Sequence, residues 1–255
     1  MGESRERNPS VYLVLGATGS VGSALCRRLT CEGQRVVAAG RNPEKLAALA
    51  EDLDCLTVHV DAHDAPTIDH AFDVAVDTFG HIDGVANCIG TLLLKPAHRV
   101  SDREWQDTIV TNLTSAFAVV RAAAERMRNN GGALVLMSSA AARIGLAHHE
   151  AIAAAKAGII GLTLAAAASY ASRGIRINAI APGLVRSQMT KKLWETETAA
   201  ETSAAMHPLG RLGEPVEIAD TIAWLLGPQA SWITGQVIGA DGGLATIMSR
   251  PRARP

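Results

Sequence analysis

Short apolar runs alternate with helical patterns from one end of the chain to the other. The apolar runs predict seven strands, at Val11–Leu15, Arg35–Ala39, Leu56–Val60, Gly84–Asn87, Ala133–Ser138, Arg176–Ile180 and Gln236–Gly239. The segments between them predict six helices, at Val21–Cys31, Pro43–Leu49, Ala65–Phe79, Asp102–Arg128, Ala151–Ser172 and Pro215–Leu226. Continuously apolar strands that alternate with helices indicate a parallel sheet covered on both faces. Right-handed crossovers then predict an α/β fold with one doubly wound sheet.

The chain predicts a single domain over residues 1–255, because no Pro/Ser-rich linker and no internal repeat interrupts it. Residues 187–210 interrupt the alternation of strands and helices with a polar, helical segment that has no strand partner. Insertions of this length after a strand's carboxyl end are usually lids, so we expect a substrate lid at 187–210. A surface helix pair with no gating role is the alternative. Arginines alternate with prolines at the C-terminus, and we expect a frayed basic tail at 249–255.

Composition excludes several classes of protein. The chain of 255 residues is 48% hydrophobic and 19% charged, which is typical of a globular domain with a full core. Its formal net charge of −1 provides no basic surface for nucleic acid or an acidic membrane. The longest apolar stretch, Ala157 to Ala168, has 12 residues, whereas a membrane span needs about 20. We therefore expect no nucleic-acid partner and no membrane partner.

The four cysteines also limit the options. Cys26, Cys31, Cys55 and Cys88 show no C-x-x-C spacing and no histidine at ligand spacing. Free thiols in a reducing compartment are therefore expected, together with a cytoplasmic location and no metal site. The polar N-terminus lacks the apolar region of a secretory signal, which agrees with that location.

A glycine-rich turn follows the first predicted strand. Gly16, Gly19 and Gly22 form a G-x-x-G-x-x-G pattern that opens the first helix. Such glycines let the backbone approach a pyrophosphate, and the helix N-terminus supplies free N–H groups and a partial positive charge. The context of strand, turn and helix is that of a Rossmann-type, NAD(P)-binding sheet. The sequence thus predicts cofactor contacts from Gly16, Thr18, Gly19, Ser20, Val21 and Gly22.

The end of the second strand bears on the choice between the two nicotinamide cofactors. An acidic residue there would bind the adenosine ribose 2′-OH and favour NAD, but the sequence reads Ala39-Gly40-Arg41-Asn42. Arg41 can instead pair with a 2′-phosphate. We therefore expect NADP, with NAD as the less favoured cofactor, and contacts from Arg41 and Asn42. A solvated arginine at the start of a helix is the alternative.

Several separate segments carry a resemblance to one enzyme family. Ser139 follows a buried strand, Ile152 comes thirteen residues later, and Lys156 four residues after that. This resembles the Ser…Tyr-x-x-x-Lys active site of the short-chain dehydrogenases/reductases, with isoleucine in place of tyrosine. Asn112 matches the helix asparagine of that site. The segments at 177–187 and 208–243 resemble 3-oxoacyl-acyl-carrier-protein reductases. The glycine pattern departs from the family's usual G-x-x-x-G-x-G, because Ser20 stands where a glycine is common.

The resemblance implies further cofactor contacts. Asp61, with Ala62 beside it, corresponds to the position that contacts adenine. Asn87 and Gly90 stand in the segment that lies along the adenosine ribose. Val185 corresponds to the backbone that meets the nicotinamide carboxamide, and Ser187 stands for a threonine. Its remaining implied contacts are Pro182, Gly183 and Lys156.

The resemblance also implies the chemistry. In the family, hydride leaves the nicotinamide for a carbonyl carbon while tyrosine protonates the oxygen. Ser139 would hydrogen-bond that oxygen, Lys156 would hold the nicotinamide ribose, and Asn112 would support a water linked to bulk solvent. Ile152 can neither donate nor accept a proton. General acid catalysis contributes about 10²- to 10⁴-fold, so the loss of the tyrosine is a large one.

Because Ile152 cannot transfer a proton, another residue near it would have to act as the proton donor. His148 and His149 would lie on the face of Ile152 if the helix extends back that far. His149 also precedes Lys156 by seven residues, which resembles the Tyr-x6-Lys spacing of divergent enoyl reductases. Glu150 is the third candidate, provided that a loop turns it inward. The alternative is that all three are polar residues of an exposed loop.

Taken together, these features predict an NADP-dependent oxidoreductase of the short-chain type that acts on a carbonyl or a conjugated enone or enoyl compound. The substrate would be a small molecule, with an acyl thioester among the options. Two alternatives remain: a catalytically silent NADP-binding subunit or cofactor sensor, and a redox-neutral enzyme that uses the same pocket. The apolar helix at Ala157–Ala168 and the resemblance of Gly235–Ala245 to a family dimer contact predict a homotetramer.

Overall fold

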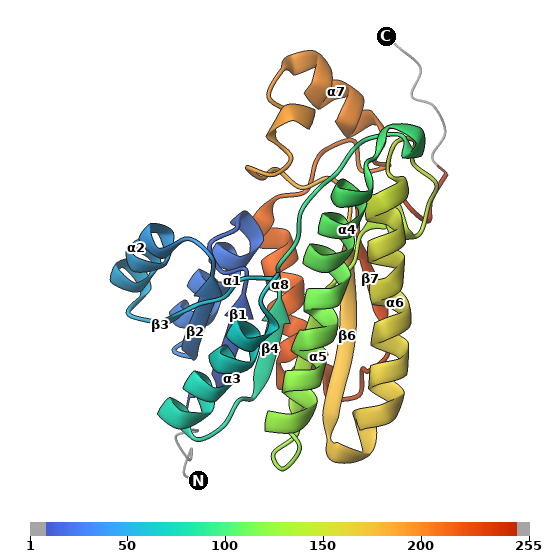
Figure 1. Cartoon of the computed structure of the whole chain (residues 1–255). Coiled ribbons are helices and arrows are strands. Elements are labelled where there is room, and N and C mark those ends of the chain that lie inside the picture. Colours follow the sequence, from blue (N-terminus) through green and yellow to red (C-terminus); the bar gives the residue numbers. More distant parts are fainter. Residues whose placement is uncertain (1–8, 249–255) are drawn as a thin grey trace, which may run out of the picture.

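One parallel sheet organises the computed structural model, which describes residues 9–248 (Figure 1). Its strands are β1 (Val11–Leu15), β2 (Arg35–Gly40), β3 (Leu56–His59), β4 (Gly84–Asn87), β5 (Gly132–Met137), β6 (Ile175–Pro182) and β7 (Val237–Ala240). They lie in the order β3-β2-β1-β4-β5-β6-β7, and every neighbouring pair is parallel. The strand order reverses between β1 and β4, which confirms the predicted doubly wound fold.

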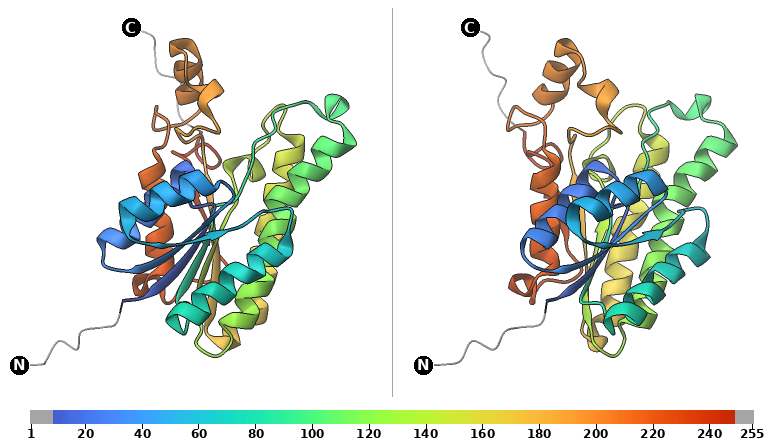
Figure 2. Two further views of the ribbon diagram at one scale, coloured as in Figure 1. Left: turned by 60° about the vertical axis from the view of Figure 1, so that its left-hand side comes forward. Right: turned by 90° about the vertical axis from the view of Figure 1, so that its left-hand side faces the viewer.

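Helices cover both faces of this sheet (Figure 2). They are α1 (Ser20–Cys31), α2 (Pro43–Leu53), α3 (Ala65–Phe79), α4 (Asp102–Ile109), α5 (Ser115–Arg126), α6 (Glu150–Tyr170), α7 (Glu197–Ala205) and α8 (Pro215–Leu226). Helices α1 and α8 pack together on one face, and α3, α5 and α6 pack on the other. The chain is thus folded into three layers around its sheet.

The pleat of β1 shows how the sequence builds these layers. Successive side chains of a strand point to opposite faces. Leu13 and Leu15 join the buried cluster under α3, α5 and α6, whereas Val14 joins the cluster under α1 and α8. All three side chains are fully buried. A strand with both faces covered must be apolar at every position, which is why the strands read as continuous apolar runs.

The helix predicted at Asp102–Arg128 differs from the observed one. A π-helical turn, η2 (Val110–Thr114), separates α4 from α5, and the backbone N–H of Ser115 bonds to the carbonyl of Val110. Asn112 sits within this turn, and its side chain donates to the Thr108 carbonyl at 2.9 Å. An apolar repeat near 3.6 residues does not reveal one inserted residue, so the sequence predicted one continuous helix.

Two segments lie outside the layers. The region predicted as a lid contains the short helix η5 (Lys191–Leu193) and α7, which stands above the carboxyl edge of the sheet (Figure 1). The tail predicted at 249–255 lies outside the described residues. One segment, Glu150–Arg173, is long and apolar enough to cross a membrane by length and composition. That alone is weak evidence, because the core helix of a soluble protein passes the same test, and α6 packs against β6 and α5.

Candidate active site

A cavity of about 440 Å³ opens at the carboxyl edge of the sheet. It lies between the glycine-rich turn after β1, the end of β5, the start of α6 and the predicted lid. The predicted site residues that line it are Thr18, Gly19, Ser20, Val21, Gly22, Gly90, Ser139, His149, Lys156, Pro182, Gly183, Val185 and Ser187. Residues from distant parts of the chain therefore meet in one space.

The other predicted residues lie outside this lining. Gly16, Arg41, Asn42, Asp61 and Ala62 follow the ends of β1, β2 and β3 along the same edge, and Asn87 is the last residue of β4. Asp61 and Asn87 use their side chains locally, since Asp61 Oδ1 accepts from His63 N–H and Asn87 Oδ1 accepts from Ile89 N–H. Arg41 is exposed, and no ion pair forms with it among residues 9–248.

The glycine-rich turn has the geometry that a dinucleotide needs. Gly16 has a φ of 75°, and a Cβ there would lie 2.7 Å from the carbonyl carbon of Cys88. A Cβ on Gly22 would collide with the carbonyl oxygen of Gly16. Gly19 caps α1 without a side-chain acceptor for the first-turn N–H groups, and the first-turn residues Ser20, Val21 and Gly22 line the cavity. Backbone without side chains beside a helix N-terminus fits the pyrophosphate of NAD(P).

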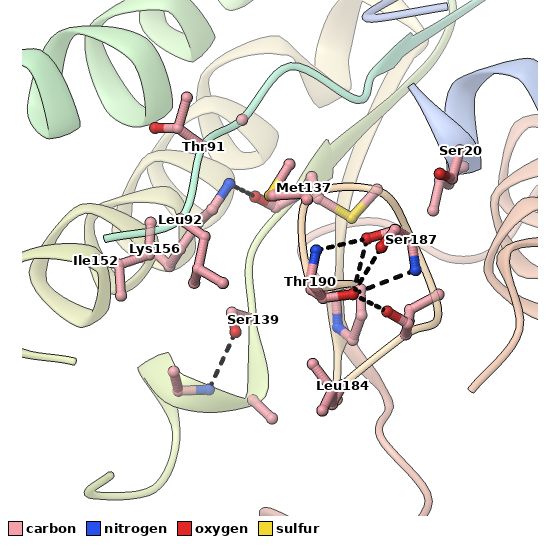
Figure 3. Close-up of a pocket in the computed structure, with 18 of the residues that line it drawn as sticks. Ser20, Thr91, Leu92, Met137, Ser139, Ile152, Lys156, Leu184, Ser187 and Thr190 are labelled. Atoms are coloured by element: carbon pink, nitrogen blue, oxygen red, sulfur yellow. Dashed lines mark hydrogen bonds between the residues drawn. The ribbon is translucent and has the colours of Figure 1, made fainter. Parts of the chain in front are cut away.

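Lys156 lies on the opposite wall and is buried in spite of its charge. Its Nζ donates to the carbonyl oxygen of Met137 at 2.9 Å (Figure 3). Burial lowers the pKa of Lys156 to about 8, while Cys88 acts in the opposite direction. Gly90 lies between this ammonium and Asn112, because a Cβ on Gly90 would be 3.4 Å from Nζ and 3.1 Å from Asn112 Oδ1.

Asn112 is buried behind the cavity wall. Its Oδ1 accepts from the Thr91 N–H at 3.1 Å, and its Nδ2 donates to Thr91 Oγ1 at 3.0 Å. Thr91 itself lines the cavity. The π-turn therefore anchors the chain segment that follows β4, and this is the observed contribution of Asn112 to the site.

The two serines after β5 have different partners. Ser138 Oγ donates to the Lys156 carbonyl at 2.9 Å. Ser139 Oγ accepts from the Ala141 N–H at 3.1 Å, as the cap of the short helix Ala140–Ala142. That bond uses an oxygen lone pair and leaves the Ser139 proton available to an acceptor in the cavity.

Ile152 occupies the wall beside Lys156 and Leu92 (Figure 3). Only 3% of its surface is exposed, so it is a packed residue of the wall. Its side chain brings neither a donor nor an acceptor to the cavity that Ser139 also lines. Among residues 9–248, the cavity lining thus contains serine and threonine hydroxyls and the Lys156 ammonium but no tyrosine.

Of the three candidate donors, only His149 lines the cavity. Its Nδ1 donates to the Ala147 carbonyl at 2.8 Å, so Nε2 is the ring nitrogen that this bond does not use. Helix α6 begins at Glu150, and His148 has a φ of 65° in the left-handed region. The helix therefore does not extend back to His148, contrary to the arrangement that would place it on the face of Ile152.

Glu150 points elsewhere. Its Oε1 accepts from the Ala97 N–H at 3.4 Å, outside the cavity lining. Hydrogen bonding to its own backbone N–H lowers the pKa of Glu150. Its carboxylate is thereby held in the charged state at the first turn of α6, where it complements the helix dipole.

The sequence analysis missed two residues that tie the lid to the site. Thr190 Oγ1 donates to the Val185 carbonyl at 2.6 Å, lies 2.9 Å from Ser187 Oγ and accepts from Trp194 Nε1 at 3.2 Å (Figure 3). His207 is buried, with Nε2 accepting from the Leu184 N–H and Nδ1 donating to the Ser203 carbonyl. The Ser187-x-x-Thr190 spacing was the one feature of the sequence that indicated a contact between these two side chains. Lys45, which also lines the cavity, had no such feature.

Comparison with known proteins identifies relatives of similar length. Residues 16–245 match a family described as "Enoyl-(Acyl carrier protein) reductase". The chain is 35% identical over 240 residues to the 3-oxoacyl-[acyl-carrier-protein] reductase FabG of Thermotoga maritima, covering 92% of this chain and 97% of that protein. It is also 35% identical over 240 residues to the 3beta-hydroxysteroid dehydrogenase 1 of Eggerthella lenta, covering 91% and 92%.

A solved structure gives the same result. A single-residue variant of actinorhodin polyketide ketoreductase with NADPH superposes with a TM-score of 0.89 at 30% identity, covering 94% of this chain and 98% of that one. The residues matched by the family, 16–245, include the glycine-rich turn, the β5–α6 region and the segment after β6. The chain belongs to the short-chain dehydrogenase/reductase superfamily, among the relatives of the 3-oxoacyl-acyl-carrier-protein reductases.

Proposed function

We propose that the protein is an NADP-dependent oxidoreductase that reduces a carbonyl, or a conjugated enone or enoyl group, without the family's tyrosine. The observation that supports this most directly is the shared cavity of the glycine-rich turn, Ser139 and Lys156. When bound, NADPH supplies the hydride. The solved ketoreductase relative contains NADPH, which favours the same cofactor here. The substrate is a small molecule, with acyl thioesters included because of the names of the relatives.

In this proposal each residue of the chain has a definite task. Ser139 uses its free proton to orient the substrate oxygen. Lys156 binds the nicotinamide ribose through the ammonium protons that its bond to Met137 leaves free. Asn112 holds Thr91 and so positions the wall beside the cofactor. The segment at 187–210 acts as a lid over the cavity, which it already lines through Gln188, Met189 and Met206.

The proton comes from His149 in this proposal. Among the three candidates it is the one in the cavity lining, and its Nδ1 is anchored to Ala147. An imidazolium whose Nδ1–H bonds to Ala147 still carries a proton on Nε2 that it can donate. Replacement of a tyrosine by a differently placed donor would retain part of the roughly 10²- to 10⁴-fold that general acid catalysis contributes.

A second candidate function is a catalytically silent subunit that binds NADP. The observation that favours it is the close packing of Ile152, which is 3% exposed and leaves no polar group at that position of the wall. The retained Ser139, which a silent subunit would not need, argues for the enzyme.

Two further properties belong to the proposal. Phe117 on α5 and Leu164 on α6 are 53% and 52% exposed, and burying them between copies would favour a homotetramer. Gly235–Ala245 would supply the second contact. The cysteines Cys26, Cys31, Cys55 and Cys88 are all free thiols, which agrees with a cytoplasmic location.

Cofactor preference tests the role of Arg41. NADPH should bind more tightly than NADH, because Arg41 is exposed and free to pair with the 2′-phosphate. Arg41→Asp should reverse the order through lost pairing and new repulsion. Titration by NADPH and NADH fluorescence measures both, with the exposed Arg128→Asp as the charge-matched control. Equal or tighter binding of NADH to the natural protein would contradict NADP specificity.

The pH dependence of NADPH binding tests Lys156. Its pKa is lowered to about 8, so the free protein loses the ammonium charge above that pH. If the complex needs the charged form, a proton must be taken up, and NADPH should bind roughly tenfold more weakly at pH 9 than at pH 7. Lys156→Arg stays charged and should remove this dependence. A dissociation constant that is unchanged between pH 7 and pH 9 in the natural protein would exclude the role.

Restoring the phenol tests the chemistry. Ile152→Tyr should place a hydroxyl between Ser139 and Lys156. The positive charge of Lys156 should lower the pKa of the new tyrosine, which is ordinarily near 10. The rate of ketone reduction, measured as the loss of NADPH absorbance, should rise by about 10²-fold or more. Ile152→Phe is the matched control, because it adds the same ring without the proton. Tight NADPH binding with no gain from tyrosine over phenylalanine would favour the silent subunit.

Oligomeric state tests the predicted assembly. Light scattering of the natural protein at micromolar concentration should give four times the mass of the chain. Leu164→Glu should reduce it by placing a charge in the predicted interface, whereas Met189→Glu, equally exposed on the lid, should not. A monomer mass for the natural protein would contradict the tetramer.

A further inference from the structure

His207 is a buried histidine that connects the lid to the chain after β6. Only 4% of its surface is exposed. Its Nδ1 lies 2.8 Å from the Ser203 carbonyl oxygen, which can only accept, so Nδ1 carries a proton. Its Nε2 lies 3.1 Å from the Leu184 nitrogen, whose N–H can only donate, so Nε2 carries no proton. The two main-chain partners therefore fix the imidazole in its neutral form.

The segment that contains Leu184 presents a main-chain donor to the cavity. Val185 forms a parallel bridge with Gly213, so its own N–H and C=O point away from Gly213. On that side Thr190 Oγ1 donates to the Val185 carbonyl (Figure 3). The Val185 N–H has no acceptor among residues 9–248, and Val185 lines the cavity. A ligand in the cavity can therefore bind to this N–H.

The Val185 N–H suits one end of the cofactor. A buried N–H without a partner is costly, and an amide oxygen of a ligand would satisfy it. In the cofactor of the proposed function, only the nicotinamide end carries a carboxamide. Leu184 and Val185 are consecutive, so the bond from Leu184 to His207 fixes the peptide groups beside this donor. His207 thus bears on how the nicotinamide end is bound, although it lies in the lid.

A second cavity of about 430 Å³ adjoins the site, and His207 lines both. Asp241 lines the second cavity, and a Cβ on Gly183 would lie 2.7 Å from His207 Nε2 and 3.0 Å from Asp241 Cα. The Asp241 carboxylate accepts from two main-chain N–H groups and keeps lone pairs for another donor. Arg211 and Glu217, the other charged residues of that cavity, pair with each other at 2.6 Å. A protonated imidazole would therefore have a carboxylate in the second cavity.

The remaining titratable groups around His207 are weaker partners for an imidazolium. Those of the lid are all exposed to solvent, namely Lys191, Lys192, Glu195, Glu197 and Glu201. Beside the segment after β6, Arg186 and Glu214 pair with each other at 3.2 Å. Those of the cavity lining are Lys45, Cys88, His149 and Lys156. None of these four carries a negative charge near neutral pH, since burial raises the pKa of Cys88 to about 12.

Protonation would convert His207 Nε2 from an acceptor into a donor. Two N–H groups would then face each other at Leu184, and the hydrogen bond between the lid and the segment after β6 would be lost. Histidine changes its charge between pH 5 and 8, so mild acid is enough to cause this change.

We propose that His207 is a positioning residue that makes binding of the nicotinamide end of the cofactor sensitive to acid. Its neutral form holds the lid and the 184–185 peptide in the arrangement that binds the carboxamide, and its protonation releases both. This inference deepens the proposed function and rests on it. The adenosine end would bind at the glycine-rich turn and the end of β2, so its affinity does not depend on His207.

Two ligands that differ only in the nicotinamide test the proposal. NADP⁺ and 2′-phospho-ADP-ribose have the same phosphates, so phosphate ionisation affects both alike. Calorimetry on the full chain at pH 7 and pH 5.5 gives the ratio of their dissociation constants, which measures the preference for NADP⁺. In the natural protein this preference should fall roughly fivefold or more at pH 5.5. Lys156, whose pKa is about 8, stays charged at both pH values.

Two variants separate the charge of His207 from its packing. His207→Gln keeps an acceptor for Leu184 and cannot be protonated, so it should retain the preference at pH 7 and lose most of its pH dependence. His207→Leu has no acceptor and should lower the preference roughly tenfold at both pH values. His98→Leu is the control, because His98 is exposed and outside the cavity lining. His149 is unchanged in these variants, so a difference between them and the natural protein belongs to His207.

Each outcome decides a separate point. A preference for NADP⁺ that is equal at both pH values in the natural protein, or equally pH-dependent in His207→Gln, would overturn the proposal. An equal loss of affinity for both ligands in His207→Leu would also overturn it, because that would indicate a general structural role. If the natural protein binds neither ligand, the proposed function itself fails. Binding of 2′-phospho-ADP-ribose with no preference for NADP⁺ would leave the cofactor site in place and overturn only the role of His207.

Discussion

The close contact between the turn after β1 and the chain after β4 is the constraint on which the site depends. Cys88 N–H donates to the Leu15 carbonyl at 2.8 Å, and Gly16 approaches the Cys88 backbone so closely that no Cβ fits. This contact lies where the strand order reverses, and crevices at such points bind ligands in open α/β sheets. Because all seven strands are parallel, the segments after β5 and β6 end at the same edge and complete the cavity.

The connection between β5 and α6 does not depend on a tyrosine. Ser138 Oγ donates to the Lys156 carbonyl, and Lys156 Nζ donates to the Met137 carbonyl, so two hydrogen bonds link strand to helix. In both bonds the acceptor is a main-chain carbonyl oxygen. The lysine is therefore held by the scaffold itself, and its desolvation, rather than a phenol partner, governs its protonation. In the proposed function, isoleucine at position 152 removes a proton donor, while the hydrogen bonds between β5 and α6 remain.

Most of the fold could be predicted from the sequence, because burial on both faces forces the strands to be apolar throughout. Helices α3 and α8 have the predicted bounds, and β1 and β4 do as well. The π-turn around Asn112 could not be predicted, since one extra residue barely alters the helical pattern. The left-handed backbone of His148 was equally hidden, because it accompanies a bond from Lys95 N–H to the His148 carbonyl, a contact between residues far apart in the sequence.

The candidate site likewise contains residues that could be predicted from the sequence and residues that could not. The glycine-rich turn, Ser139 and Lys156 carry signals because their chemistry requires particular residue types at fixed spacing. Thr190 and His207 carry little signal, because any donor or acceptor of suitable length could make their bonds to main-chain atoms of residues 184 and 185. Their roles arise from the tertiary arrangement of a segment that has no apolar period of its own.

The lid and the floor of the cavity differ in how firmly they are held. No residue of α7 is fully buried, and the lid is tied to the site through Thr190 and His207. The floor, by contrast, is the edge of a sheet whose β1 residues are all buried. Segments with few buried contacts open at low free-energy cost, whereas core strands open only with global unfolding. In the proposed function, reaction chemistry therefore lies on the firmly buried edge of the sheet, and substrate recognition falls to the less buried segment at 187–210.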